Sequence, residues 1–186
     1  MNGKMYGLTE YKGQYQIVDI FAYATQGLPG IEIIGAGKLA RSLKEKVIYF
    51  TRWHGVKLPM RRYIVCLDGT ELLPERVSYI YLELPFLLIL WYLAGVLPIQ
   101  SMDDCLAFGK LSSDGGVCLP NDLRPIHSLL ESFCTATGEE VKTFLDKDTD
   151  DWPGPILPLG DILNTKLNIK KMGVRSELAT VLPLNG

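Results

Sequence analysis

The stretch "LPFLLILWYLAGVLPI" (Leu84–Ile99) is the longest uncharged run of the chain, and it indicates what kind of fold the sequence builds. It has sixteen residues with a proline near each end, whereas a helix that spans a membrane needs about 20 apolar residues. A helix without a polar face belongs in a protein core. We therefore expect a fully buried core helix and no membrane span, with a helix that faces a partner as the alternative.

On the N-terminal side of this run, the pattern predicts strands in residues 15–25, 27–35 and 61–69. We expect the first two to pair as a hairpin through Gln26–Gly30. Apolar residues at spacings of three and four predict an amphipathic helix from Leu39 to about Trp53.

On the C-terminal side, residues 105–120 read as two strands joined by a tight turn at Asp114 and Gly115. A helix is expected in residues 124–137, an acidic, turn-rich segment in 142–155, and a short strand and helix in 156–167.

Together these elements predict one α/β (α+β) domain, a mixed sheet with packed helices, because strands that follow one another directly exclude a purely parallel sheet. We expect an N-terminal extension in residues 1–14, the domain in residues 15–167, and a C-terminal tail without clear periodicity in residues 168–186.

Composition narrows the range of functions that the chain can have. The 186 residues are 47% apolar with a net charge of -2, which offers no general attraction to nucleic acid or to an anionic membrane. The four cysteines have no C-x-x-C spacing and only two histidines accompany them, so reduced thiols are favoured over a zinc site. The N-terminus lacks the pattern of a secretory signal, which favours the cytoplasm.

The segment "IEIIGAGKLARSLKEK" (Ile31–Lys46) has the outline of a phosphate-binding loop. If Gly37 and Lys38 ended a G-x-x-x-x-G-K-[ST] motif, however, its first glycine would be Glu32 and its hydroxyl residue would be Leu39. We interpret the segment as a strand-turn-helix junction, and we expect no nucleotide and no other cofactor.

Several motifs in order carry a resemblance: "GLPGIEIIG" with a helix after it, "LPMRRYIVCLDGTELLPE", "LELPFLLILWYLAGVLP" and "FGKLSSDGG". From about Tyr15 to Leu167 the chain resembles the N-terminal domain of the magnesium-chelatase ChlI-like, ComM-type family. The resemblance implies the fold of the Lon proteolytic domain, shared with the second domain of ribosomal protein S five. In that family an AAA+ ATPase module follows, and the resemblance therefore implies a separate AAA+ ATPase as a candidate partner.

Three positions relate the chain to the family motifs. Glu83 keeps the family carboxylate before Leu84 and Pro85, Lys110 reverses the charge of a family glutamate, and Lys38 replaces a family acid. With these departures, the resemblance implies a diverged, stand-alone branch of the family.

A Lon-like peptidase needs a serine and a neutral lysine. The resemblance puts Tyr79 at the serine position and Arg124 at the lysine position, and a slip of one residue would put Ser78 at the nucleophile position. Arginine keeps its proton at neutral pH. We therefore expect no catalytic residue, with a degenerate Lon-like serine peptidase as the alternative.

Other candidate sites have ordinary structural explanations. Asp146–Trp152 has the alternating acids of a calcium loop but lacks its glycine and its final glutamate. His54 reads as a helix cap, and His127 has no partner implied by the sequence. Basic residues near the first predicted helix read as its solvated face, or alternatively as a weak nucleic-acid footprint: Lys38, Arg41, Lys44, Lys46, Arg52, Arg61 and Arg62.

The sequence thus predicts a non-catalytic binding protein that acts through a protein partner or through self-association. A degenerate peptidase and an accessory factor in DNA processing are the alternatives. The residues expected to contribute to an interaction are Lys38, Arg41, Lys44, Lys46, Glu83 and Lys110.

Overall fold

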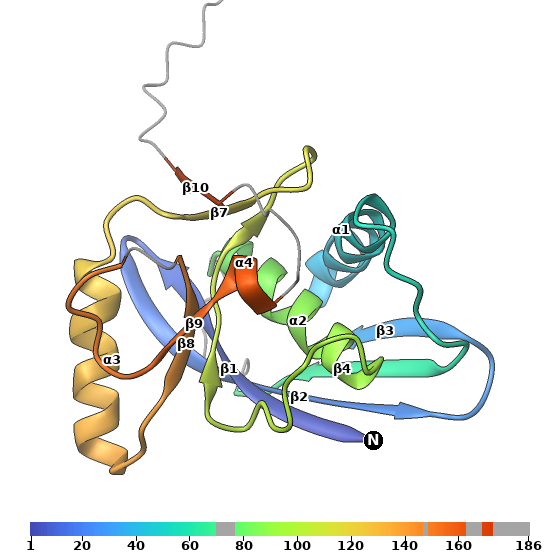
Figure 1. Ribbon diagram of the computed structural model, residues 1–186, viewed down its shortest axis with the longest axis horizontal. Coiled ribbons are helices and arrows are strands. Elements are labelled where there is room, and N and C mark those ends of the chain that lie inside the picture. Colours follow the sequence, from blue (N-terminus) through green and yellow to red (C-terminus); the bar gives the residue numbers. More distant parts are fainter. Residues whose placement is uncertain (70–76, 147–148, 163–168, 173–186) are drawn as a thin grey trace, which may run out of the picture.

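The computed structural model describes residues 1–69, 77–146, 149–162 and 169–172. Within these ranges the chain forms a seven-stranded sheet, a three-stranded sheet and four α-helices (Figure 1). The helices are α1 (Ala40–Trp53), α2 (Glu83–Leu93), α3 (Arg124–Thr137) and α4 (Leu159–Ile162). The strands are β1 (Asn2–Tyr11), β2 (Gln14–Thr25), β3 (Gly30–Ile34), β4 (Arg62–Leu67), β5 (Cys105–Leu106), β6 (Lys110–Leu111), β7 (Val117–Pro120), β8 (Lys142–Leu145), β9 (Ile156–Pro158) and β10 (Ile169–Met172).

The large sheet has the strand order β3-β4-β2-β1-β5-β8-β9. Strands β1, β2 and β4 are antiparallel to their neighbours in that run, whereas β3 joins β4 in parallel and β5, β8 and β9 continue in parallel beyond β1. The predicted mixed sheet with packed helices is therefore confirmed at the level of the fold class. The small sheet has the order β10-β7-β6.

Helix α2 is the centre of the core, as the uncharged run predicts. Every residue from Glu83 to Leu93 is buried. The indole N–H of Trp91 donates a hydrogen bond of 2.9 Å to Oγ1 of Thr51, whose hydroxyl donates to the carbonyl of Val47 on α1. A buried indole N–H without a partner would carry a desolvation cost. Because these two hydrogen bonds satisfy it, α2 can be buried on every side by other parts of the fold.

Helices cover both faces of the sheet. A Cβ atom on Gly7 of β1 would lie 2.6 Å from a methyl group of Leu82, next to the start of α2, so glycine lets α2 approach the strand. The neighbouring Tyr6 faces the opposite side, where its ring meets Phe133 of α3 edge to face at 5.2 Å between centroids. The core therefore lies mainly between the sheet and the α1–α2 pair, with α3 on the other face.

The predicted pairing of residues 15–25 with residues 27–35 is wrong. Strand β3 pairs in parallel with β4, and β4 lies between β3 and β2, with Arg62 opposite both Thr25 and Gly30. The reason is the helix between the two strands. A strand, a crossover helix and a second strand pair in parallel, and α1 supplies that crossover between β3 and β4.

Residues 1–14 are part of the sheet and not an extension, because Asn2–Tyr11 pairs with β2 along its whole length and with β5. The acidic segment 142–155 also begins with a strand, β8. The other predicted elements that fall on described residues are present, namely α1, β4, α2, the β6–β7 hairpin, α3, β9 and α4. In the predicted tail, Ile169–Met172 forms a strand beside β7, and residues 173–186 lie outside the described residues.

The described part of the chain holds no helix that is both long enough and apolar enough to cross a membrane.

Candidate functional site

The start of α2 carries a buried carboxylate that connects three parts of the fold. Glu83 is 4% exposed, and its Oε1 forms an ion pair with the ammonium of Lys46 on α1. Its Oε2 accepts a hydrogen bond of 2.9 Å from the backbone N–H of Leu111 on β6. Both oxygens are therefore used, which is what a carboxylate needs in a buried position. Glu83 joins α1, α2 and β6.

Ser78 and Tyr79 lie beside this ion pair. Together with Lys46 and Glu83 they line a cavity of about 230 Å³, whose other lining residues are Leu39, Ser42, Leu43 and Ile80. Ser78 is fixed by a two-way backbone pairing with Glu10 on β1. Its hydroxyl accepts a long hydrogen bond of 3.4 Å from the N–H of Ile80.

The cavity holds Ser78 and Lys46, but their environment does not support a catalytic dyad. A lysine acts as a general base only when it is neutral, which requires desolvation without a counterion. The amine of Lys46 instead forms an ion pair with the carboxylate of Glu83, and among the described residues the Ser78 hydroxyl is hydrogen-bonded to the N–H of Ile80 and not to that amine.

Arg124, which the family pattern puts at the lysine position, lies at the start of α3 with an exposed side chain. Its guanidinium donates to both carboxylate oxygens of Asp122, at 2.9 and 2.8 Å. These hydrogen bonds and the backbone N–H of Arg124 lower the pKa of the Asp122 carboxyl to about 2. Asp122 and Arg124 thus fix the first turn of α3, and Arg124 is not among the residues that line the Ser78 cavity.

The β6–β7 hairpin lies against the C-terminal half of α1. The Tyr49 hydroxyl donates to the carbonyl of Ser113 at 2.9 Å, and Nε2 of His54 lies 2.9 Å from the carbonyl oxygen of Gly115. The ring of His54 also packs against Phe50, tilted by 41° at 4.5 Å between ring centroids. His54 is the residue that ends α1, but its ring bonds to a carbonyl of the hairpin and not, as the sequence predicts, to the free carbonyls at the helix end.

The other histidine and the cysteines show no catalytic arrangement among the described residues. Nε2 of His127 lies 2.8 Å from the carbonyl oxygen of Asp151, and its ring meets Trp152 edge to face. All four cysteines are free thiols, and burial raises the pKa of Cys105 to about 12. Among the described residues, no three His, Cys, Asp or Glu side chains gather into a metal site. Two residues of the calcium-like segment, 147–148, lie outside that description.

The predicted interaction residues do not form one cluster of free charges. Lys38 in the turn before α1 and Arg41 on its first turn are exposed, and Lys44 is partly exposed. Lys46 and Glu83 bind each other. Lys110 is half-buried on β6, opposite Cys118.

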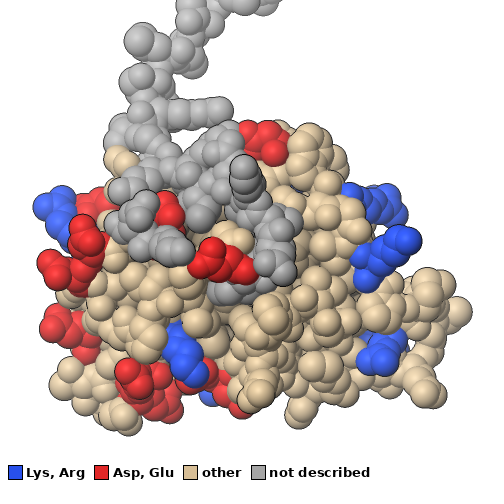
Figure 2. Space-filling view, viewed as in Figure 1, with Lys and Arg blue, Asp and Glu red and all other residues tan. Residues whose placement is uncertain are grey.

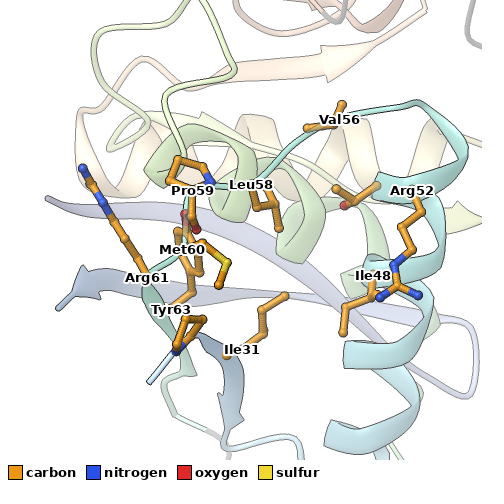
Figure 3. A pocket seen from close by; sticks show the side chains of 12 residues that line it. Ile31, Ile48, Arg52, Val56, Leu58, Pro59, Met60, Arg61 and Tyr63 are labelled. Atoms are coloured by element: carbon orange, nitrogen blue, oxygen red, sulfur yellow. Dashed lines mark hydrogen bonds between the residues drawn. The ribbon is translucent and has the colours of Figure 1, made fainter. Parts of the chain in front are cut away.

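A second cavity, on the other side of α1, was not predicted. It measures about 310 Å³ and lies between α1, the segment that follows it and the β3–β4 edge of the sheet (Figure 3). Ile31, Ile48, Leu58 and Met60 surround the hollow, and Arg61 extends outward from it. The side chain of Met60 is 82% exposed. The sequence hints at this site only through apolar residues beside two prolines, Leu28-Pro29 and Leu58-Pro59-Met60.

Charges are segregated between the two ends of the sheet. Residues 28–62 carry eight Lys and Arg against two Glu, whereas residues 101–161 carry twelve Asp and Glu against four Lys and Arg. On the face seen in Figure 2, blue side chains gather on the α1 side and red side chains on the α3 side. The small net charge of the chain therefore conceals a strongly basic end.

No model of a known protein family matches the chain, and no curated protein matches it. The resemblance to the ChlI-like, ComM-type family therefore stays a prediction that rests on the motifs.

Proposed function

We propose that this chain is a non-catalytic, Lon-domain-like protein that acts by binding a protein partner or a second copy of itself. The observation that carries the proposal is the ion pair between Lys46 and Glu83. Among the described residues that line the Ser78 cavity, Lys46 carries the one amine. This amine is bound to the carboxylate of Glu83, whereas the Ser78 hydroxyl is hydrogen-bonded to the N–H of Ile80, so no base is positioned on the serine.

We propose for the chain the fold of the Lon proteolytic domain, shared with the second domain of ribosomal protein S five. The order of elements along the chain supports it, with a mixed sheet, a central apolar helix and the β6–β7 hairpin before α3.

The binding part of the proposal is supported by exposed apolar side chains at the β3–β4 end. Leu28, just before β3, and Met60, just before β4, are 89% and 82% exposed. Large apolar side chains that gather at one end of a protein mark an interaction site more often than scattered ones do. A separate AAA+ ATPase is the candidate partner that the family resemblance provides.

Two measurements on the purified full chain test this function. A fluorophosphonate probe and fluorogenic peptides are expected to give no labelling and no hydrolysis, and Ser78→Ala is the matched control. Labelling of the wild type that Ser78→Ala abolishes would overturn the non-catalytic assignment. Affinity capture from native lysate and sedimentation velocity then test binding, since a strictly monomeric chain that captures no partner would contradict it.

An accessory role in DNA processing is the second candidate, and the basic end of the sheet favours it. If it is correct, binding to single-stranded DNA falls steeply with salt and is lost on charge reversal at Arg41 and Lys44. Lys46 is unsuitable for this test because its reversal would leave two negative charges at the buried Glu83 site. Unchanged binding in the Arg41→Glu, Lys44→Glu variant would remove this candidate.

A further inference from the structure

We propose that the free edge of β3 and the apolar cavity beside it bind an extended, acidic peptide segment of a protein partner by strand addition. The inference rests on the binding role proposed above and assigns that role a site and a ligand class.

Strand β3 has one side available for pairing. Among the described residues it pairs with β4 alone. The N–H of Gly30 donates to the carbonyl of Arg61 at 3.1 Å, and the N–H and C=O of alternate residues in a strand point to opposite sides. Gly30, Glu32 and Ile34 therefore face β4, and the backbone groups of Ile31 and Ile33 face the free edge.

An added strand would place side chains next to the cavity. Ile31 lines the cavity, so the α1 face of the sheet at this edge opens into it. Side chains of an added strand alternate between the two faces, and every second one would lie on the α1 face, beside Ile31, Ile48 and Met60. Strand addition characteristically gains affinity from main-chain bonds and specificity from such pockets.

The volume suits one or two apolar side chains. About 310 Å³ is at the lower end of the range for binding pockets, and its lining is mainly apolar: Pro29, Ile31, Ile48, Val56, Leu58, Pro59, Met60 and Tyr63. We therefore expect an aliphatic or aromatic residue at alternate positions of the bound segment.

The expected charge of the bound segment follows from the charged residues around the cavity. Arg52 and Arg61 line the cavity, and neither forms an ion pair with a described residue. Lys57 lies in the same segment after α1. An acidic flank on the ligand would complement these cations, whereas a basic flank would be repelled.

A second copy of the chain is the competing occupant, and the test below separates it. A β3 edge pairing with the β3 edge of another copy would bring the two basic ends together, with eight Lys and Arg in residues 28–62 of each copy. Like charges oppose that arrangement, so the peptide is the occupant that the charges favour.

The experiment is a selection followed by binding measurements. Displayed random peptides of about nine residues, enough to extend past the five residues of β3, are selected on the immobilised full chain. The most enriched peptide is then labelled with fluorescein and titrated with each variant by fluorescence anisotropy. We expect the enriched peptides to alternate apolar and polar residues between acidic flanks.

The key variant is Ile33→Pro. Proline removes the N–H at the free edge and leaves the bonds to β4 in place, because proline is tolerated where the N–H faces outward on an edge strand. We expect Ile33→Pro to weaken binding at least about tenfold. Ile33→Ala is the matched control, since it loses a similar side chain but keeps the N–H, and circular dichroism checks that both variants are folded.

Charge is tested separately. Arg61→Glu is expected to weaken binding about fivefold or more at low salt, with a smaller effect at high salt. Lys12→Glu, in the turn between β1 and β2 at the far end of those strands, makes the same change in net charge and is expected to have no effect.

The outcomes separate the inference from the proposed function. The proposed peptide site would be overturned by equal binding to Ile33→Pro and Ile33→Ala, by enrichment of basic peptides, or by no enrichment. It would also be overturned if the wild type were a dimer that Ile33→Pro converts to a monomer. None of these results changes the Ser78 labelling test. Conversely, Ser78-dependent labelling alongside successful selection would overturn the non-catalytic function and leave the proposed peptide site in place.

Discussion

Replacing Lys46 by methionine should destabilise the fold, although the residue reads in the sequence as a solvated lysine on an amphipathic helix. The change keeps most of the side-chain volume and removes the charge that faces Glu83. The Glu83 carboxylate then keeps only the Leu111 N–H, in a position that is 4% exposed.

The magnitude follows from this geometry. Removing one partner of a fully buried ion pair costs about 3–5 kcal/mol. The Lys46 side chain is 39% exposed, so water screens the pair, and we reduce the expected loss to about 2 kcal/mol of unfolding free energy. For a chain of this size the loss corresponds to a fall in Tm of about 4–8 °C.

The assay is urea denaturation followed by circular dichroism, with Lys44→Met as the matched control on the same helix. The control is expected to change the unfolding free energy by less than about 0.5 kcal/mol. Glu83→Gln combined with Lys46→Met should recover part of the loss, because the amide oxygen still accepts from Leu111 and no buried charge remains. A Lys46→Met variant as stable as Lys44→Met, or strictly additive effects, would refute the reasoning.

Three further predictions concern the cysteines, a glycine pair and an ion pair. Burial raises the pKa of Cys105 to about 12. We therefore expect iodoacetamide at about pH 8 to modify Cys134 and Cys118 in the native chain and to leave Cys105 unmodified until denaturant is added. Peptide mass spectrometry would show which cysteines are modified. Gly35→Ala should lower the unfolding free energy by about 3 kcal/mol, because its Cβ would lie 2.4 Å from the carbonyl oxygen of Leu67 at a φ of +89°. Gly37 has a φ of +52° and open space around it, so Gly37→Ala should lower it by about 1 kcal/mol. Equal losses of unfolding free energy in urea denaturation would contradict this prediction. Desolvation raises the pKa of the Asp104 carboxyl, but the hydrogen bond and charge of Lys142 outweigh it and lower that pKa below its usual value. The pair therefore stabilises the native state above the unfolded pKa of about 4, and this contribution is lost as the pH falls through the lower native value. The wild type should thus be slightly more stable than Lys142→Met near pH 7, and urea denaturation at a series of lower pH values should show this difference disappear.

The elements that the sequence predicts correctly are those whose signal is local. Helix α2 follows from a single uncharged run, α1 from apolar residues spaced by three and four, and the β6–β7 hairpin from the Asp114-Gly115 turn. Each signal lies within about fifteen residues, where periodicity and turn chemistry decide the conformation.

Features that depend on distant contacts could not be predicted in the same way. The position of β4 between β2 and β3 depends on a crossover through α1, and Asn2–Tyr11 is recognised as a strand only through its partner β2. The ion pair joins residues that are 37 positions apart. The cavity at Met60 exists because a loop, a helix and a strand edge come together, which no single segment encodes.

The structure changes the meaning of the basic first helix. In the sequence its cations read as one solvated face, but successive residues turn by about 100° around a helix, which puts Lys46 and Arg52 on different sides of α1. Lys46 faces α2 and forms an ion pair with Glu83 in the cavity beside Ser78. Arg52 lines the cavity at the β3 edge, where its charge stays available to a ligand. One side of α1 is therefore occupied by a structural ion pair. The other side carries a charge and a sheet edge that have no partner among the described residues, and these are the features on which the proposed binding site depends.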